Sequence, residues 1–445
     1  MLKSNIAWMK KNVPSDLKVW KGMIQDIDWS QVAAKTKLSL QRDKDRITAE
    51  FKEFAAMDTS AKIDWLMNGD RHLGYLYKKD AIAFARREWK GLKSVGYDFV
   101  GWLKIWGGML NMVMKDPVSI MLAVFEYHWF ASYLATPAVV DRSVFGRRGK
   151  LLQADFDMWV AITHWAEDLI ANLIMADAKI GGNQKINKRI IMFDEMTMAQ
   201  MMAGFPNLLG IPYQMIPVFM VSEMDQLTLI PYIDAIESYG LPSDTCPLPT
   251  AECGCAVKDE YPMCGQGFIA SSMPCDGSVM ATSFQDRRFS KFMPSYPLCM
   301  PVRYDDEDTT EMAAADMKDC IHWVEGLTGE TWNWDTYFAT MEKMNECTRL
   351  EMEKWEINKT HYPQLVGSSF ELFRKWNYEM DGGLFPEGLK TQRKICKTMM
   401  ETYEKKLPAY VGGYEKYRAL IWSCPAHFYA NFSNWLANCW GIYAL

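Results

Sequence analysis

Short apolar segments alternate with amphipathic segments between Lys188 and Gly326, and this alternation constrains the fold more than any other feature of the sequence. The amphipathic segments carry apolar residues at the three- and four-residue spacing of helices. Strands that alternate with helices are typical of a parallel sheet with helical crossovers. We therefore expect an α/β lobe with strands at residues 189–193, 267–272 and 298–304, an extended segment at 210–221, and helices at 196–203, 225–239, 278–291 and 311–326.

Helical regions are predicted on both sides of this lobe. The expected organisation is a helical N-terminal region (1–185), the α/β lobe (186–334), a helical connector (335–410) and the start of a second α/β lobe (411–445). The second lobe consists of a strand at 418–422, a helix at 426–437 and a strand at 441–445. A single β-α-β unit would leave an apolar sheet edge open. We expect another chain to complete this lobe, or part of the protein to be absent from the sequence.

The most hydrophobic segment, residues 118–140, is long enough to span a bilayer. Glu126 and His128 lie at its middle, however, and a charge at the bilayer centre is costly. The sequence therefore favours a buried helix and no membrane insertion. No signal peptide is visible, so we expect a cytoplasmic protein whose 11 cysteines are reduced thiols.

Charge and motifs exclude several classes of function. The formal net charge is −6, and the basic residues are interspersed with acidic ones, which argues against nucleic acid as a partner. The chain has no G-x4-G-K-[ST] phosphate loop, so we do not expect it to hydrolyse ATP. Its histidines form no H-E-x-x-H pattern, which excludes the corresponding zinc hydrolases.

Five of the cysteines lie close together in a predicted loop (residues 241–266) and just after it, with the spacing C-x6-C-x-C-x8-C-x10-C. This spacing matches neither zinc ribbons nor bacterial ferredoxins. Irregular spacing is expected when the ligands of one cluster come from separate loops, and thiolates are the usual ligands of iron–sulfur clusters. The candidate ligands are Cys246, Cys253, Cys255, Cys264 and Cys275.

The position of Cys275 strengthens the cluster hypothesis. It follows the predicted strand 267–272 and precedes a helix, so it lies at the carboxyl end of a parallel strand, where open α/β sheets bind ligands. The amide groups at the start of that helix would favour an anionic cluster. Cys246 can reach the same edge from the preceding loop.

Two alternatives remain for these cysteines. They are buried small apolar side chains, as is common for cysteine, or they bind zinc. Burial is the favoured interpretation for Cys320, Cys347, Cys396 and Cys439, which lie in helical patterns. The acidic run 305–308 is interpreted as a solvated helix cap and not as a metal site.

The sequence from about Arg189 to the end resembles the 2-hydroxyacyl-CoA dehydratase family, which includes benzoyl-CoA reductases and double-cubane cluster proteins. The resemblance rests on the order and spacing of several motifs. They are Ser-Asp-Thr-Cys-Pro (243–247), Met-Pro-Cys-Asp-Gly (273–277), Pro-Leu-Cys-Met-Pro-Val (297–302), Ile-His-Trp-Val-Glu-Gly-Leu-Thr-Gly (321–329), Asn-Glu (345–346) and the stretch 363–367.

The resemblance implies two flavodoxin-like lobes around a cubane cluster, with three cysteine ligands from each subunit. Cys246 and Cys275 would be the first two ligands, and Cys424 at a strand end of the second lobe would be the third. A [4Fe-4S] cluster is favoured. Cys253, Cys255 and Cys264 depart from the three-cysteine pattern and could serve a double-cubane [8Fe] cluster. The helical region before residue 180 extends beyond the usual core of the family.

The function implied is that of an iron–sulfur subunit of an acyl-CoA dehydratase or reductase of anaerobic metabolism. Such enzymes use low-potential one-electron chemistry through a ketyl radical. The implied partners are a paralogous subunit or a second copy, an ATP-hydrolysing iron–sulfur activator protein and an acyl-CoA substrate. The alternative is a non-catalytic electron-relay or structural subunit whose cluster is fully ligated by cysteine.

Overall fold

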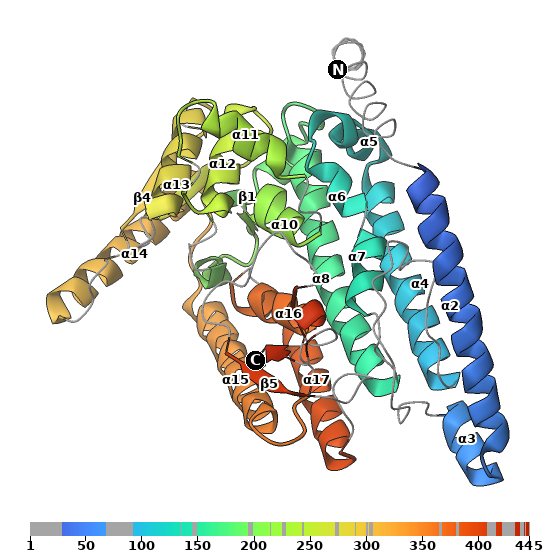
Figure 1. Ribbon diagram of the computed structural model, residues 1–445. Coiled ribbons are helices and arrows are strands. Elements are labelled where there is room, and N and C mark those ends of the chain that lie inside the picture. The colour runs from blue at the N-terminus through green and yellow to red at the C-terminus, as the bar shows by residue number, and fades with distance from the viewer. Residues whose placement is uncertain are drawn as a thin grey trace.

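The computed structural model shows a mostly helical molecule built around a small parallel sheet (Figure 1). The residues that it describes are 29–67, 92–134, 136–144, 149–194, 199–213, 215–224, 228–242, 244–271, 276–289, 291–299, 301, 306–364, 367–379, 382–406, 415–420, 432–436, 440 and 442–444.

The four-stranded sheet has the order β2-β1-β3-β4, and all its strand pairs are parallel. This order matches the first four strands of flavodoxin-like folds. The sheet confirms the predicted α/β class. Its strands are β1 (Ile190–Phe193), β2 (Leu209–Pro212), β3 (Gly267–Ser271) and β4 (Ser295–Leu298).

Both faces of the sheet are buried, and alternate residues of each strand enter different cores, as the two-residue period of a strand requires. Met192 and Phe268 pack in the larger core, which also contains the N-terminal helices. Ile191 and Ile269 pack in a smaller core on the opposite face. This second face is covered by Ile321 and its neighbours on α14 (Glu307–Thr328). The sheet is therefore the middle of three layers.

Short helices connect the strands and differ from the sequence predictions in several places. The expected extended segment 210–221 is only β2 at its start. Its remainder is the π-helix η3 (Met215–Phe219) and the beginning of α10. The predicted strand 298–304 is wrong at its described positions after Leu298, because β4 ends there and residues 299 and 301 are not in a strand. The other connecting helices are η2 (Ala199–Gly204), α10 (Met220–Met224), α11 (Ile230–Glu237), α12 (Pro247–Val257) and α13 (Asp276–Phe289).

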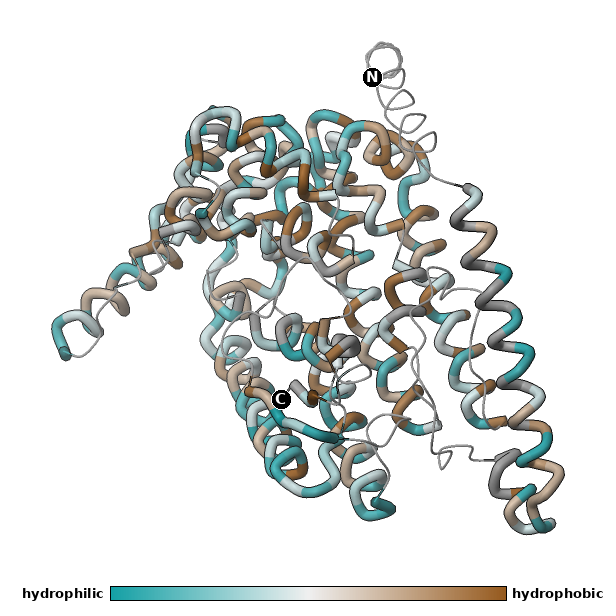
Figure 2. The backbone as a smooth tube through the Cα atoms, in the orientation of Figure 1, coloured by the Kyte–Doolittle hydropathy of each residue, from teal (hydrophilic) through white to brown (hydrophobic). Residues whose placement is uncertain are grey.

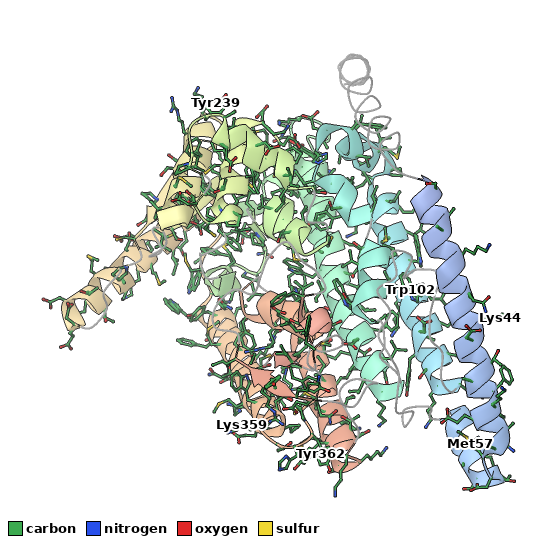
Figure 3. The ribbon with its side chains drawn as sticks, viewed as in Figure 1. Lys44, Met57, Trp102, Tyr239, Lys359 and Tyr362 are labelled. Carbon is green, nitrogen blue, oxygen red and sulfur yellow. The ribbon has the colours of Figure 1, made fainter. Side chains whose placement is uncertain are left out.

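The described residues of the N-terminal region (1–185) are mostly helical, as predicted, and Figure 2 shows hydrophobic and hydrophilic segments alternating along the long helices. Trp102 of α4, labelled in Figure 3, meets Phe156 of α8 edge to face with ring centroids 6.2 Å apart. Gly101 allows this contact, because a Cβ there would lie 2.3 Å from the Phe156 ring. The helices are α2 (Trp29–Ala56), α3 (Thr59–Met67), α4 (Leu92–Lys115), α5 (Pro117–Glu126), α6 (Phe130–Leu134), α7 (Thr136–Ser143), α8 (Gly149–Ala176) and α9 (Gln184–Asn187).

The hydrophobic segment 118–140 is buried at many positions, but the prediction of one helix is wrong. It forms most of α5, then α6 and the start of α7. Within the described residues no single helix has both the length and the apolar composition of a membrane span. The pair α4 and α5 meets these criteria jointly, but its two helices are bent by 98° at their junction. Asp116 causes the new start after the bend, because its side chain accepts the Ser119 N–H and Pro117 opens α5.

The C-terminal part contains the predicted charged helices, followed by a second small sheet in which β5 and β6 pair in parallel. Inside the helices, the fully buried Lys354 pairs with Glu351 at 2.6 Å and donates a hydrogen bond to Gln392 at 2.7 Å. These contacts link α15 to α17. The elements are α15 (Trp334–Asn358), α16 (Ser368–Glu379), η4 (Gly382–Leu384), α17 (Pro386–Glu404), β5 (Tyr417–Ala419), α18 (Phe432–Trp435) and β6 (Ile442–Ala444).

Candidate functional site

The carboxyl edge of the sheet contains a switch point between β1 and β3. The chain leaves β1 toward β2 on one side, and β3 lies on the other side, so the connections after β1 and β3 diverge. Open α/β sheets bind their ligands in the crevice outside such a point. Two candidate cysteines adjoin elements of this part of the fold in the sequence: Cys275 lies between β3 and α13, and Cys246 directly precedes α12, the helix before β3.

Asp194 is the first residue after β1 and fixes this edge. It is 1 % exposed, and its carboxyl group accepts the Ser271 N–H at 2.5 Å and the Ser271 hydroxyl at 3.1 Å. It also accepts the Thr282 hydroxyl of α13 at 3.4 Å. One side chain thus ties the ends of β1 and β3 to the helix that follows. This role was not predicted from the sequence, although an acidic residue directly after an apolar run is a signal for it.

Cys275 lies outside the described residues. The connection that contains it is short, because β3 ends at Ser271 and α13 begins at Asp276. Asp194 contacts both sides of this connection through Ser271 and Thr282. The predicted order of strand, cysteine and helix is therefore retained, and the position of the Cys275 thiol stays a prediction.

Cys246 is the N-cap residue of α12 and is exposed. Pro247 and Pro249 follow it, and the Cys246 carbonyl accepts the Thr250 N–H at 3.2 Å. Because proline has no N–H, Leu248 is the only one of the first three helical residues with a backbone donor, and the Cys246 side chain makes no capping hydrogen bond. Because α12 packs against α13, the two candidate cysteines precede two neighbouring helices (Figure 1).

Cys253 and Cys255 lie in the body of α12, where a loop had been predicted for residues 241–266. Both are fully buried, and a two-residue step in a helix turns their side chains to nearly opposite sides. Cys253 packs with Ile236 and Ala281, whereas Cys255 belongs to the large core. Burial raises the pKa of the Cys253 thiol to about 12, which keeps it protonated.

Cys264 is also fully buried, in the turn before β3. Its sulfur lies 3.9 Å from the Met192 sulfur, and burial raises its pKa well above the ordinary value for a thiol. The environments of Cys253, Cys255 and Cys264 thus match the alternative of small apolar packing side chains. Within the described part of the chain, no three or more His, Cys, Asp or Glu side chains are grouped to hold a metal ion.

Cys299 is a further candidate that sequence analysis missed. It is exposed and is the first residue after β4, and its N–H donates to Asp316 at 2.5 Å. The register pairs Leu298 with Ser271, so Cys299 follows β4 at the level where the Cys275 connection leaves β3. The predicted strand 298–304 had placed Cys299 inside a strand. The correct strand end would have shown it at the carboxyl edge.

The remaining sequence candidates fall elsewhere. Cys424 lies outside the described residues, between β5 and β6 in the sequence. The acidic run 305–308 acts as the predicted cap where it is described: Asp306 is the N-cap of α14 and accepts the Thr309 N–H at 2.7 Å. Cys320 and Cys347 are buried in α14 and α15, and Cys396 is buried in α17, as expected for packing residues.

Comparison with known proteins gives one family match. Residues 226–444 match the family model of the 2-hydroxyglutaryl-CoA dehydratase D-component. The match begins later in the chain than the resemblance expected from the sequence, which started near Arg189. The match includes β3, β4, the helices α12 to α17 and the second sheet. No curated protein matches the chain. The matched residues, about half of the chain, also carry the motifs around Cys246 and Cys275, so this part of the chain matches the 2-hydroxyacyl-CoA dehydratase family.

Proposed function

We propose that this chain is the iron–sulfur subunit of an enzyme that removes water from a 2-hydroxyacyl-CoA thioester. The family match supports a dehydratase-type enzyme component. The cluster, a [4Fe-4S] cluster in the favoured case, would be held at the carboxyl edge of the sheet by Cys246 and Cys275. Cys424 is the proposed third ligand.

The observation that carries this proposal is the contrast between the cysteines of one short segment. Cys246 is exposed at a helix N-terminus, whereas Cys253 and Cys255 on the same helix are fully buried. Metal binding requires the deprotonated thiol. Of these three cysteines only Cys246 is exposed, so it alone is accessible to a cluster outside the sheet edge.

The fit of the sheet edge to a cluster can be judged from its donors. Soft thiolates suit iron–sulfur clusters. Cys299 is exposed and follows β4 at the level where the Cys275 connection leaves β3, and Cys246 is exposed at the start of α12, which packs against α13. Asp194 fixes Ser271 at the start of that connection and Thr282 beyond it. A ligand between these two points would be held by elements that are already rigid, as metal sites require.

When bound, a low-potential cluster supplies single electrons, the chemistry needed to expel a hydroxyl group from the position next to a thioester carbonyl. The donor to this cluster is proposed to be an ATP-hydrolysing iron–sulfur activator protein. The second subunit implied by the name D-component is the proposed partner that completes the substrate cavity. The chain's own role is to hold thiolates at the sheet edge.

A non-catalytic relay with a fully cysteine-ligated cluster is the competing function. Its support came from three extra cysteines near the site. Cys253 packs with Ile236 and Ala281, Cys255 and Cys264 belong to the large core, and the burial of all three favours packing roles over ligation. Ring reduction of the benzoyl-CoA reductase type stays an alternative reaction for the same site.

The test is anaerobic purification of the full chain with iron and sulfide analysis and EPR. We expect a brown protein with about one cubane's worth of iron per chain or per dimer. Cys275→Ser should remove most of this iron, because a hydroxyl is a harder and less acidic donor than a thiol. Cys347→Ser, at a buried position of α15, is the control and should keep it. Stoichiometric zinc in a colourless protein, or equal iron in both variants, would refute the proposal.

A further inference from the structure

A small cavity lies inside the helical N-terminal region. The residues that line it belong to α4, α6, α7, α8 and α10, and most of them are apolar or aromatic. Its volume is about 10 Å³, close to that of one water-sized sphere. Three short or acidic polar side chains also line it: Thr136, Thr163 and Glu167.

Glu167 reaches the cavity from α8 and is 7 % exposed. Its carboxyl group lies against α4 at Gly108, where a Cβ would come within 2.1 Å of the Glu167 Oε2 atom. Its other oxygen, Oε1, is buried and has no hydrogen-bond partner among the described residues. The nearby cation Lys115 pairs instead with Asp168. A buried carboxyl group of this kind requires a polar partner in the space beside it.

Thr163 lies one turn before Glu167, on the same face of α8. A threonine inside a helix can donate its hydroxyl to the carbonyl group four residues earlier, as Thr340 does to Thr336 in α15. The Thr163 hydroxyl is buried and makes no hydrogen bond in the part of the chain that the structure describes. Two adjacent polar groups without partners therefore line one cavity.

The third polar group completes the set. The Thr136 hydroxyl donates to the Tyr133 carbonyl group at 2.6 Å, and its oxygen can still accept a hydrogen bond. Burial raises the pKa of Glu167 to about 8, so near neutral pH its carboxyl group can both donate and accept. The cavity thus has three polar partners, which is the number that a buried water molecule typically binds.

A soft metal ion is the competing occupant. Met109, Met112, Met220 and Met224 line the same cavity, and thioethers are ligands of soft cations such as Cu(I). Methionine is also a common gap filler in protein cores, however, and the two groups that lack partners are oxygens, which suit water. The polar groups and the volume therefore favour water.

We propose that this cavity binds one internal water molecule, which bridges the Glu167 carboxyl group and the Thr163 hydroxyl group and contacts Thr136 as its third partner. The water would be a structural part of the contact between α8 and its neighbours α4 and α7. These residues lie outside the part of the chain that matches the family, so the proposal does not depend on the cluster or on the proposed reaction.

Thr163→Val tests the proposal through the sign of its effect on stability, because valine has the shape of threonine without the hydroxyl. If a water binds this hydroxyl, the substitution removes that hydrogen bond, and we expect the equilibrium constant of unfolding to rise about fivefold in denaturant titration. Removing a buried hydroxyl that has no partner would instead stabilise the protein. An unchanged or lower unfolding constant would therefore overturn the proposal.

Thr340→Val is the matched control for this substitution. Thr340 is buried to a similar extent, but its hydroxyl donates to a carbonyl group of its own helix. The control should change the unfolding constant by less than about twofold, because this backbone contact adds little to helix stability.

A crystal structure of the full chain identifies the occupant directly. We expect one peak of electron density within hydrogen-bond distance of Glu167 Oε1 and Thr163 Oγ1, with no anomalous signal at the copper edge. The peak should be lost in Thr163→Val. An anomalous peak bound by the methionine sulfurs would overturn the proposal. So would a direct hydrogen bond between Thr163 and Glu167 in place of the peak, or a cavity without density in the parent.

Discussion

Carboxyl and thiol groups have different surroundings at the carboxyl edge of the sheet and in the apolar interior behind it. At the edge, the Asp194 carboxyl group accepts hydrogen bonds from Ser271 and Thr282, and the Cys246 thiol is exposed at a helix N-terminus. In the interior, burial raises the pKa of Glu167 to about 8 and that of Cys253 to about 12. Burial among apolar side chains thus favours the protonated forms of Glu167 and Cys253.

The contrast teaches that proximity in sequence does not define a ligand set. Cys246, Cys253 and Cys255 lie within ten residues of the sequence, yet α12 gives them different surroundings. Cys246, the N-cap residue, is exposed, whereas the body of α12 packs between α11 and α13. A thiol becomes a ligand only where the surroundings favour its deprotonated form.

The largest effect is expected from Gly254→Ala, which tests how tightly the interior part of α12 is held. A Cβ at this position would lie 1.9 Å from the Tyr232 carbonyl oxygen of α11. Backbone cannot move aside locally, so we expect the unfolding free energy to fall by about 3 kcal/mol in denaturant titration. Gly326→Ala in α14 is the control, since a Cβ there meets nothing within 4 Å. It should leave stability unchanged or raise it by up to about 1 kcal/mol. Equal stability of the two variants would contradict this close packing.

Glu167 tests whether the interior keeps acids neutral. Burial raises its pKa to about 8, so between pH 5 and pH 8 the folded state holds a proton that the unfolded state has lost. Stability should therefore fall across this window, by about 2–4 kcal/mol from this group, and should level off above it. Glu167→Gln should remove that part of the pH dependence. Parallel curves for parent and variant, from denaturant titrations at several pH values, would show that Glu167 is not buried as described.

Asp194→Ala tests the edge. It leaves the buried Ser271 N–H without its carboxyl acceptor, which should cost about 2 kcal/mol of stability. If Asp194 positions the Cys275 connection, the variant should also lose iron. Thr282→Val, which removes a long hydrogen bond of 3.4 Å to Asp194, should keep both properties near the parent values. Full iron retention in Asp194→Ala would show that Asp194 does not position a cluster ligand.

The sequence could predict the α/β class because its signals are local. Residues 190–193 are an apolar run, as a strand buried on both faces requires, and β3 lies within one residue of its predicted range. The predictions failed where tertiary packing decides. A Cys- and Pro-containing segment resembled a loop, but Pro247 at the first helical position and Gly254 against Tyr232 allow α12 to form.

The candidate site was predictable only in part. The N-terminal position of Cys246 follows from the prolines after it, but the burial of Cys253 depends on Ile236 and Ala281, which come from two other helices. Cys299 was missed because a strand boundary was placed several residues too late. Asp194 was missed because its partners Ser271 and Thr282 are more than seventy residues away in the sequence.

The most direct test of the central claim compares Cys246→Ser with Cys253→Ser, two substitutions within one helix. Iron and acid-labile sulfide are measured in both variants and in the parent after anaerobic purification. We predict that Cys246→Ser loses most of its iron while remaining folded, because it changes an exposed N-cap. Cys253→Ser should keep the parent's iron content and lose about 1–2 kcal/mol of stability, because it buries a hydroxyl among apolar side chains. Loss of iron in Cys253→Ser with full retention in Cys246→Ser would contradict the account and place the cluster in the interior.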